Sequence, residues 1–417
     1  MVFDLGFDFG TSGARAIAID RSGTIVAGAQ TPLSAQTPEG WRDALFFLLE
    51  QIPIAVRSQV RAVAIDGTSS TCLACDRAGT TIAPPILYND RRAAAILDRL
   101  RAIAPPNHLT ISASSSLAKL LWACDSGYFA QNTPLYFLHQ ADWIAFLLHG
   151  QLAIGDYHNA LKLGYDPETL CYPDWLLDAV PGTIQLPETV APGTKIAKIR
   201  KKIGDRFRLP PDCAIVAGTT DSIAAFLASP ARQPGEAVTS LGSTLVLKLL
   251  SRTRIDDARF GIYSHRFGDL WLAGGASNAG GAVLRQFFGD RQLTELSERI
   301  DPNRASPLDY YPLLEPGERF PVNDPELAPR LAPRPESDVE FLHGLLESLA
   351  RIEARGYQCL QTSGATPLAR VYSAGGGAQN PTWSAIRRRC LGVEVVTSPQ
   401  TEAAYGTALL AASGAGS

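Results

Sequence analysis

Carboxylates, hydroxyls and glycines gather in four short stretches, each at the end of a strand-like run. The stretches are Asp8-Phe9-Gly10-Thr11-Ser12-Gly13, Gly218-Thr219-Thr220-Asp221-Ser222, Gly242-Ser243-Thr244 and Gly375-Gly376-Gly377-Ala378-Gln379-Asn380. Glycine lets the backbone approach a ligand closely, backbone amides and hydroxyls donate to phosphate, and carboxylates accept protons or hold Mg²⁺. One such turn proves little, because glycine and serine are common in turns. Four of them favour nucleotide binding.

The first stretch lies between two strand-like runs. Phe3, Leu5, Phe7 and Phe9 alternate with small or polar residues, which is the period of a strand with one buried face. A second run covers residues 14–19, and the link between the two runs is short enough only for a tight turn. The pattern predicts an antiparallel hairpin. On this stretch alone, an ordinary hairpin with polar turn residues explains the sequence as well as phosphate binding does.

The elements around these stretches indicate a mixed sheet in the first half of the chain. A third strand is expected at 24–29, a helix at 42–57 and a returning strand at 60–65, followed later by a buried strand at 213–217 and a helix at 223–228. A Rossmann unit would alternate strand and helix from the start, so it is not expected here. Residues 150–157 and 173–192 are interpreted as loops.

The second half repeats the opening pattern. Residues 237–241 and 245–249 form a strand pair around Gly242-Ser243-Thr244, after a linker at 229–235. We therefore predict an α/β fold with two duplicated domains, 1–228 and 229–417, that face each other across a cleft. Later elements are expected at 270–273, 279–288, 339–355, 370–374, 381–390, 393–397 and 402–412. The last helix, 402–413, is expected to pack back on the first domain.

Composition limits the classes of function. The chain has 417 residues, 46% of them hydrophobic and 19% charged, with a net charge of -3, as in ordinary globular proteins. This charge gives no general attraction to nucleic acid, and the basic clusters at 198–202 and Arg387-Arg388-Arg389 are interpreted as solvated faces. No signal peptide or apolar run of about 20 residues is visible, so a cytoplasmic protein is expected.

Several common catalytic and metal motifs are absent from the sequence. It contains no G-x-x-x-x-G-K-[ST], H-E-x-x-H or G-x-S-x-G pattern. Cys72 and Cys75 have a C-x-x-C spacing without a second pair, so they are interpreted as buried thiols in a strand. The triple-glycine stretch has Asn380 where a dinucleotide motif needs its last glycine. It still suits a nucleotide base and sugar.

In this order along the whole chain, the motifs resemble those of the FGGY carbohydrate kinases, which share the actin-like (ribonuclease H-like) ATPase fold. Asp8 to Ser12 is similar to the first phosphate motif, Gly218 to Asp221 to the motif with the catalytic aspartate, and Ser240 to Thr244 to the second phosphate motif. Further similarities are the glycine-rich segment 274–281, the adenosine motif at Gly375–Asn380, and the segments 85–91, 120–122 and 157–160.

The resemblance implies ATP and Mg²⁺ as cofactors and gives each stretch a role. Asp221 would be the catalytic base, and Asp8 would hold the metal. The phosphate-binding residues would be Gly10, Thr11, Ser12, Gly13, Gly242, Ser243 and Thr244, and the adenosine-binding residues Gly376, Gly377, Gln379 and Asn380. The substrate-binding residues would be Asp8, Ser69, Ser70, Asp221 and Ser222. For Asp8 a turn-capping role, and for Asp221 a helix N-cap, are the structural alternatives.

The chain also departs from the family. Members that act on xylulose usually carry a Met-His pair where this sequence has Ser69 and Ser70, and typical members are longer between residues corresponding to 288 and 339. The sequence resembles most the short cyanobacterial and plant group described as xylulose-kinase-like, whose better substrate is D-ribulose. The resemblance thus implies an ATP-dependent kinase of a ketopentose.

Other functions stay open at this point. The substrate alternatives are xylulose and other ketoses or polyols, and the alternatives of another class are an actin-like ATPase and a sugar or nucleotide sensor. The expected partners are the sugar and ATP or ADP, with no nucleic acid, membrane or obligate protein partner. A plant-type relative would lie in an organelle stroma instead of the cytoplasm.

Overall fold

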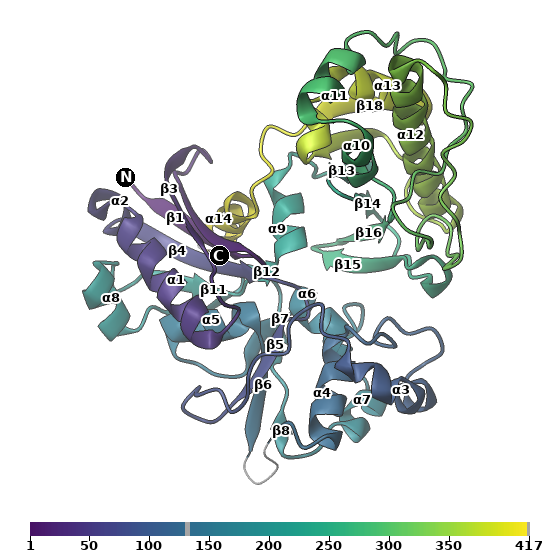
Figure 1. Ribbon diagram of the computed structural model, residues 1–417. Helices are drawn as coiled ribbons and strands as arrows, with labels where there is room; N and C mark the ends of the chain where they lie inside the picture. The colour runs from purple at the N-terminus through teal and green to yellow at the C-terminus, as the bar shows by residue number, and fades with distance from the viewer. Residues whose placement is uncertain (130–133, 415–417) are drawn as a thin grey trace. The chain divides into compact units, whose positions relative to one another are not determined.

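The chain forms two compact units in the computed structural model, which describes residues 1–129 and 134–414 (Figure 1). The first unit comprises Met1–Ala228 together with the segment from Gln400 onward, and the second comprises Ser229–Pro399. The C-terminal helix α14 (Ala403–Gly414) thus belongs to the first unit, and the second unit ends at Pro399 instead of at residue 417. The last three residues of the chain lie outside the described residues.

The first unit is built on a mixed sheet. Strands β1 (Phe3–Phe9), β2 (Gly13–Ile19) and β3 (Ile25–Pro32) form the antiparallel meander, and β4 (Val60–Gly67) returns parallel to β1. Strands β11 (Ala214–Val216) and β10 (Lys195–Lys198) complete the order β10-β11-β4-β1-β2-β3, and β12 (Thr219–Thr220) pairs with the end of β4. The mixed sheet that the sequence predicts is confirmed.

The alternation in β1 separates two faces of this sheet. Phe3, Leu5, Phe7 and Phe9 enter one hydrophobic core with residues of α1 (Pro38–Gln51) and α5 (Gln140–His149). The intervening residues face α14, where a Cβ on Gly6 would lie 2.2 Å from the backbone N of Ala408. Glycine is therefore needed for α14 to approach the strand, and it brings that helix close to the carboxylates of the same face.

Helix α1 begins earlier and ends earlier than the periodicity predicts. Thr37 caps its N-terminus by accepting from the Gly40 amide at 3.1 Å, and Pro38 occupies the first turn, where it needs no N–H partner. The helix ends at Gln51 because Pro53 cannot continue it, and the short helix α2 (Ile54–Arg57) follows. The single predicted helix over 42–57 is therefore two helices.

A smaller layer of the first unit has its own sheet, β5 (Cys72–Cys75), β6 (Leu135–His139) and β8 (Ile184–Gln185), with its own hydrophobic core. Cys72 and Cys75 are buried in β5, and burial raises the pKa of each thiol to about 12, as expected for structural cysteines. The helices of the first unit beyond those above are α3 (Leu97–Ile103), α4 (Ser116–Asp125), α6 (Tyr157–Ala160), α7 (Asp174–Ala179), α8 (Lys201–Phe207) and α9 (Asp221–Ala228).

The loops predicted at 150–157 and 173–192 were wrong in part. Strand β7 (Ile154–Asp156) pairs with β9 (Glu188–Val190), and α7 starts directly after Pro173. Proline is accepted at the start of a helix and beside short strands, so it marked the borders of these elements instead of excluding them.

The second unit repeats the sheet of the first. Its strands are β13 (Glu236–Leu241), β14 (Leu245–Ser251), β15 (Tyr263–Phe267), β16 (Leu270–Ala276), β17 (Arg370–Ala374) and β18 (Glu394–Thr397). Their order is β15-β16-β14-β13-β17-β18, so the hairpin β13–β14 stands where β1–β2 stands, with β17 parallel to β13 as β4 is to β1. The predicted internal duplication is confirmed.

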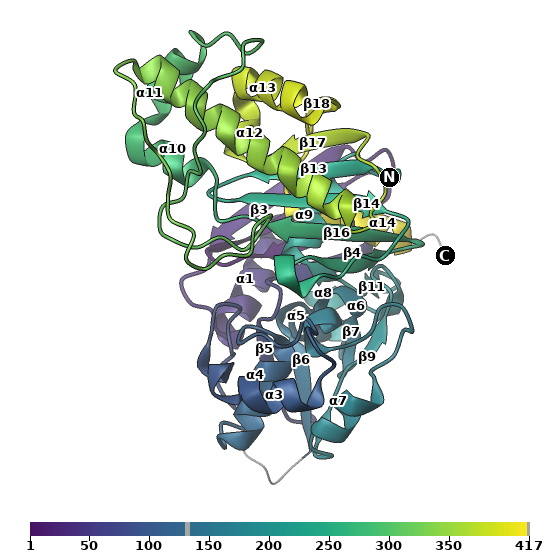
Figure 2. The ribbon, with the colours of Figure 1, turned by 90° about the vertical axis from the view of Figure 1, so that its right-hand side faces the viewer.

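Helices cover the second sheet. Helix α12 (Asp338–Thr362) crosses it and packs against β14 and β16 (Figure 2), beside α13 (Pro381–Leu391). Helices α10 (Gly281–Phe287) and α11 (Asp290–Ser297) follow the glycine-rich end of β16. None of the described helices is both long and apolar enough to cross a membrane.

Only part of the predicted basic surface is solvated. Lys198, Lys201 and Lys202 are exposed, but Arg387 is fully buried in the second unit. Its guanidinium donates to both carboxylate oxygens of Glu353 at 2.6 and 2.7 Å and to Ser373 Oγ at 2.6 Å. The interpretation of Arg387 as part of a solvated face was therefore wrong, because a buried carboxylate pairs with it.

Candidate functional site

The turn between β1 and β2 forms an open, polar hollow. The Gly10 amide donates to the Gly13 carbonyl at 3.0 Å and closes the turn, and the Gln36 side chain donates to the carbonyls of Gly10 and Thr11 at 3.1 and 2.6 Å. Thr11 and Ser12 are exposed. A cavity of about 400 Å³ beside the turn is lined by Asp8, Gly10, Ser12, Gly13, Ala14, Arg15, Gln30, Thr31 and Pro32.

Two carboxylates lie side by side at this end of the sheet. Asp8 of β1 and Asp66 of β4 are directly opposite each other in the parallel ladder, on the face that α14 covers. Asp66 is fully buried, and Thr407 of α14 donates to its Oδ2. Its Oδ1 has no hydrogen-bond partner among residues 1–129 and 134–414.

Burial and charge shift the pKa values of this pair. Burial raises the pKa of Asp8, and two effects partly oppose that rise: hydrogen bonding with the Asp66 carboxyl when that group is protonated, and the Arg15 guanidinium, 3.7 Å from Asp8 Oδ2. Burial and the neighbouring Asp8 raise the pKa of Asp66 well above its ordinary value, with a smaller contribution from Asp221. Two carboxylates held this close favour a shared proton or a bound cation between them.

Asp221 directly follows β12, the strand next to β4. In the short parallel pairing of β12 with β4, Thr219 is opposite Asp66 and Thr220 is opposite Gly67. Asp221 then begins α9, and the Ser222 amide donates to its Oδ1 at 2.6 Å. A Cβ on Gly218 would lie 1.8 Å from the Ile65 carbonyl oxygen, so glycine is required where the chain approaches β4.

The segment after β4 is held rigidly. Ser69 is half-buried, whereas Ser70 is buried with φ of 65°, and its Oγ has no hydrogen-bond partner in the described part of the chain. The buried Lys119 ammonium donates to the carbonyls of Ser70 and Leu87 at 2.8 and 2.7 Å. Burial lowers the pKa of Lys119. The clamp fixes the segment that the sequence analysis predicts to contact sugar.

The predicted adenosine residues meet in one pocket of the second unit. Gly376, Gly377, Gln379 and Asn380 line a cavity of about 500 Å³ together with Gly242, Leu284, Leu293 and Trp383. Asn380 caps α13 by accepting from the Trp383 amide at 3.0 Å and donates to Ser297 Oγ at 2.8 Å. The cavity has the size and the apolar walls that a nucleobase and ribose require.

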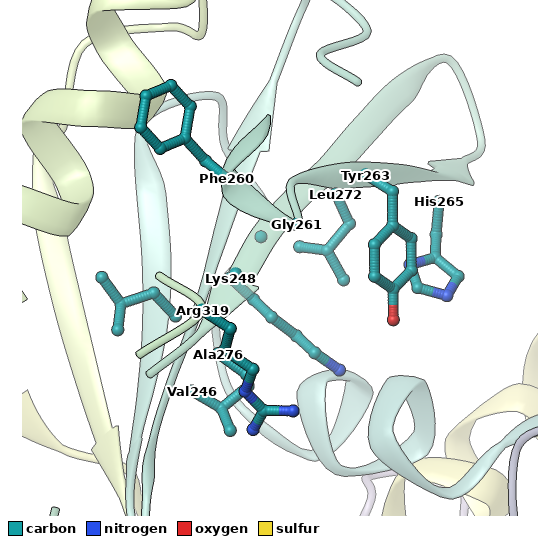
Figure 3. A pocket seen from close by; sticks show the side chains of 12 residues that line it. Val246, Lys248, Phe260, Gly261, Tyr263, His265, Leu272, Ala276 and Arg319 are labelled. Carbon is teal, nitrogen blue, oxygen red and sulfur yellow. The ribbon is translucent and has the colours of Figure 1, made fainter. Parts of the chain in front are cut away.

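A separate pocket of the second unit lies beside strands β14, β15 and β16, and the sequence did not predict it (Figure 3). It encloses about 150 Å³ over the glycines of β16. Lys248 of β14 and Arg319, from the stretch between α11 and α12, line it together with Tyr263 and His265 of β15.

The carboxylates of Asp8 and Asp66 suit Mg²⁺, which needs few protein ligands, better than a metal that is held entirely by protein side chains. Among the described residues, no group of three or more His, Cys, Asp or Glu side chains is placed to hold a metal. Mg²⁺ is usually held through one or two carboxylates with phosphate oxygens and water. The unpartnered Oδ1 of Asp66 beside Asp8 provides the hard oxygen atoms that such a site needs.

Comparison with known proteins identifies the class. The N-terminal domain of the FGGY family of carbohydrate kinases matches residues 3–228, and the C-terminal domain matches residues 237–415. The chain is 22% identical to a xylulose kinase of Staphylococcus epidermidis (99% of this chain, 88% of the relative) and 23% identical to one of Bacillus subtilis (100% and 89%).

Solved structures agree on the fold. Xylulose kinase from Lactobacillus acidophilus superposes with a TM-score of 0.86 at 18% identity, covering 100% of this chain and 89% of that one. Glycerol kinase from Plasmodium falciparum, with ADP, superposes with a TM-score of 0.82 at 15% identity, covering 99% and 90%. The protein is thus a two-domain α/β kinase of the actin-like type. It belongs to the FGGY carbohydrate kinase family and is an ATP-dependent sugar kinase.

Sequence reasoning left out three residues that the structure places around this site. Asp66 had a signal, because it ends a strand and precedes a glycine, but the motifs described above assign it no role. Thr407 and Lys119 had none, because each reaches its partner from a helix distant in sequence. Hydrophobic periodicity locates a helix but does not tell which strand end its polar side chains meet.

Proposed function

We propose that the protein transfers the γ-phosphate of ATP to a primary hydroxyl of a ketopentose, with D-ribulose as the best substrate. The observation behind this proposal is the convergence of Asp8, Asp66 and the Thr220–Asp221 step on three neighbouring strand ends of one sheet. Such an arrangement supplies a base and oxygen ligands within one short stretch of structure, as phosphoryl transfer requires.

In this mechanism Asp221 accepts the proton of the sugar hydroxyl. The hydroxyl oxygen forms a new bond to the γ-phosphorus of ATP, the bond between that phosphorus and the β-phosphate oxygen breaks, and ADP leaves. The Ser222 amide donates to Asp221 Oδ1 at 2.6 Å and so orients the carboxylate that would accept this proton. Asp8, together with Asp66 on the neighbouring strand, would hold Mg²⁺, which neutralises charge on the phosphates when bound. The amides and hydroxyls of the Gly10–Gly13 and Gly242–Thr244 turns would bind the phosphates, and the 500 Å³ pocket the adenosine.

The choice of sugar follows from the segment after β4. Ser69 and Ser70 offer short hydroxyls in place of the Met-His pair that xylulose-specific members usually carry, and Ser222 would add a third hydroxyl, so the sugar would be recognised by small donors and acceptors. Ser70 is buried with an unsatisfied Oγ in the described structure and a backbone fixed by Lys119. A buried polar group without a partner is costly, and a sugar hydroxyl would satisfy it.

The test is a panel of ketoses and polyols assayed for ADP release, with D-ribulose and D-xylulose at equal concentrations and a reaction without sugar as baseline. We expect ADP release to rise well above the baseline, with kcat/KM higher for D-ribulose than for D-xylulose. A reversed order would contradict the choice of sugar. A turnover that no sugar increases would contradict the mechanism and favour an ATPase or a sensor.

A further inference from the structure

The turn Gly242–Thr244, which is proposed to bind phosphate, is hydrogen-bonded to residues 277–282, the segment that follows β16. The Gly281 amide donates to the Gly242 carbonyl at 2.9 Å, and the Ala282 amide donates to the Ser243 carbonyl at 3.2 Å. The contact is close, because a Cβ on Gly280 would lie 2.5 Å from the Ser243 carbonyl oxygen and one on Gly281 would lie 2.8 Å from that of Gly242. The shape of the turn therefore depends on the position of residues 277–282.

Glu318 fixes the start of that segment. One of its carboxylate oxygens accepts from Ser277 Oγ at 2.6 Å, and the other accepts from the Asn278 amide at 2.7 Å. The Asn278 side chain donates to the Gly317 carbonyl at 3.0 Å, which adds a third bond between the two segments. Ser277 is also tied to β14, since its amide donates to the Leu245 carbonyl at 2.9 Å.

The chemistry of this contact requires a carboxylate. Glu318 is 2% exposed and accepts additional bonds from Tyr311 Oη at 3.0 Å and from the Arg319 amide at 2.9 Å. An ionised carboxylate only accepts hydrogen bonds, whereas an amide has a single acceptor oxygen and two N–H donors. The two amides at Glu318 can only donate and the two hydroxyls donate as well, so a carboxylate satisfies the full set where an amide side chain would lose one acceptor oxygen.

We propose that Glu318 is a positioning residue for nucleotide phosphates, acting through Ser277 and Asn278 on the Gly242–Thr244 turn. This inference rests on the proposed role of that turn in phosphate binding. Glu318 does not line the adenosine pocket, although Gly242 and Gly281 do, so its removal should weaken the phosphate contacts more than the contacts of the base and ribose.

The neighbouring pocket gives no alternative explanation for this arrangement. Arg319 follows Glu318 and lines the pocket beside strands β14, β15 and β16 (Figure 3), but Glu318 does not line that pocket. The Glu318 carboxylate instead accepts from Tyr311 of its own loop and from Ser277 and Asn278, and so joins that loop to the glycine-rich segment. The effect of replacing Glu318 should therefore appear in phosphate binding and not in a property of the pocket.

The test compares nucleotide affinities by calorimetry, which needs no sugar substrate. In Glu318→Ala we expect ADP affinity to fall about 10-fold, the consequence of losing a charge-assisted contact, while adenosine affinity stays within about 2-fold of the wild type. Glu318→Gln keeps one acceptor oxygen, so its ADP affinity should lie between those of the wild type and Glu318→Ala. Ser277→Ala combined with Glu318→Gln should lose less than the sum of the single changes, because the two side chains share one bond.

A matched control separates positioning from general destabilisation. Glu347 is another buried carboxylate of the second unit, where Arg389 donates to both of its oxygens at 3.0 and 2.6 Å. Glu347→Gln should lower the melting temperature and leave ADP affinity unchanged. Equal losses of ADP and adenosine affinity in Glu318→Ala would overturn the inference, as would an unchanged ADP affinity.

The result also separates this inference from the proposed function. Selective loss of ADP affinity in a protein that no sugar activates would support the role of Glu318 and contradict sugar phosphorylation. If ADP affinity equals that of the wild type in Ser243→Ala, Thr244→Ala and Glu318→Ala alike, neither the hydroxyls of the turn nor its position matters for phosphate binding, and the inference fails even in an active kinase.

Discussion

Asp8 and Asp66 stand opposite each other on neighbouring parallel strands, with the Asp66 carboxylate sealed beneath Thr407 of the last helix. The relationship joins the first strand, the fourth strand and the C-terminal helix at one point. It explains why the C-terminal segment belongs to the first unit, because the sheet alone does not cover Asp66. The same pairing places two carboxyl groups, those of Asp8 and Asp66, beside the position proposed for a phosphate-bound cation.

Asp4 and Asp66 respond differently to neutralisation. Both are fully buried, but Asp4 receives two bonds from Arg61 at 3.1 and 2.7 Å, whereas Asp66 faces a second carboxylate. Asp4→Asn should lower the free energy of unfolding by about 1–3 kcal/mol, because it weakens a buried charge-assisted contact. Asp66→Asn keeps an acceptor for Thr407 and removes the repulsion, so it should not destabilise the protein.

Chemical denaturation at pH 8 without divalent cations, applied to both variants, checks this contrast. A loss of stability in Asp66→Asn as large as that in Asp4→Asn would contradict the description of Asp66 as a carboxyl group whose ionised form is unfavourable beside Asp8.

Asp156 should make stability depend on pH. Burial and the nearby Asp142 raise its pKa from 3.8 to about 7 in the folded protein. Because the folded pKa is the higher one, the folded state binds the extra proton, and the stabilisation is present at low pH and lost as pH rises from about 4 to 7. The slope in that window is at most about 1.4 kcal/mol per pH unit for one proton.

Asp156→Asn should flatten the pH dependence of the melting temperature between pH 4 and 7. The substitution is isosteric. Asn159 Oδ1 has no hydrogen-bond partner in the described structure, and a rotation of the Asn159 amide would let this oxygen accept from the new side-chain amide at position 156. Asp178→Asn, on the exposed side of α7, is the control. An unchanged pH profile in Asp156→Asn would show that this carboxyl does not titrate in the window.

Lys119 should affect sugar binding alone. Lys119→Met keeps the length of the side chain but leaves the carbonyls of Ser70 and Leu87 without their shared donor. The segment that includes Ser69 and Ser70 then loses its anchor, and KM for the sugar should rise about 10-fold while KM for ATP stays the same. Steady-state kinetics with each substrate varied in turn measures the split.

Lys202→Met on the exposed face of α8 is the control for Lys119→Met, and it should change neither constant. A parallel rise of both KM values in Lys119→Met, accompanied by a lower melting temperature, would indicate that Lys119 stabilises the whole unit instead of the sugar segment.

The sequence predicted those parts of the fold that local pattern determines. Alternation in β1 and the glycine-containing turns after β1 and β13 predicted the strands, the hairpins and the duplication, because these depend on neighbours along the chain. Helix ends were less predictable: Pro53 ended α1, and Pro173 began α7 where a loop was expected. Proline has both effects, and only the packing around it decides between them.

Long-range pairing was beyond local pattern. Arg387 belongs to a run of three arginines that indicates a solvated surface, yet it is buried because Glu353, on another helix, supplies a carboxylate. Asp66 needs Thr407, and Glu318 needs Ser277, each far away in the chain. The turn residues were found because their own chemistry identifies them, whereas the residues that position them were not.

The most direct measurement for the central claim is kcat for ketopentose-dependent ADP release in Asp221→Asn. The substitution preserves an acceptor for the Ser222 amide and removes the base, with Asp98→Asn on the exposed side of α3 as the matched control. We expect kcat to fall about 10²-fold or more with ADP affinity unchanged, the usual cost of losing a general base. A kcat within about 3-fold of the wild type would contradict the assignment of Asp221 as the group that activates the sugar.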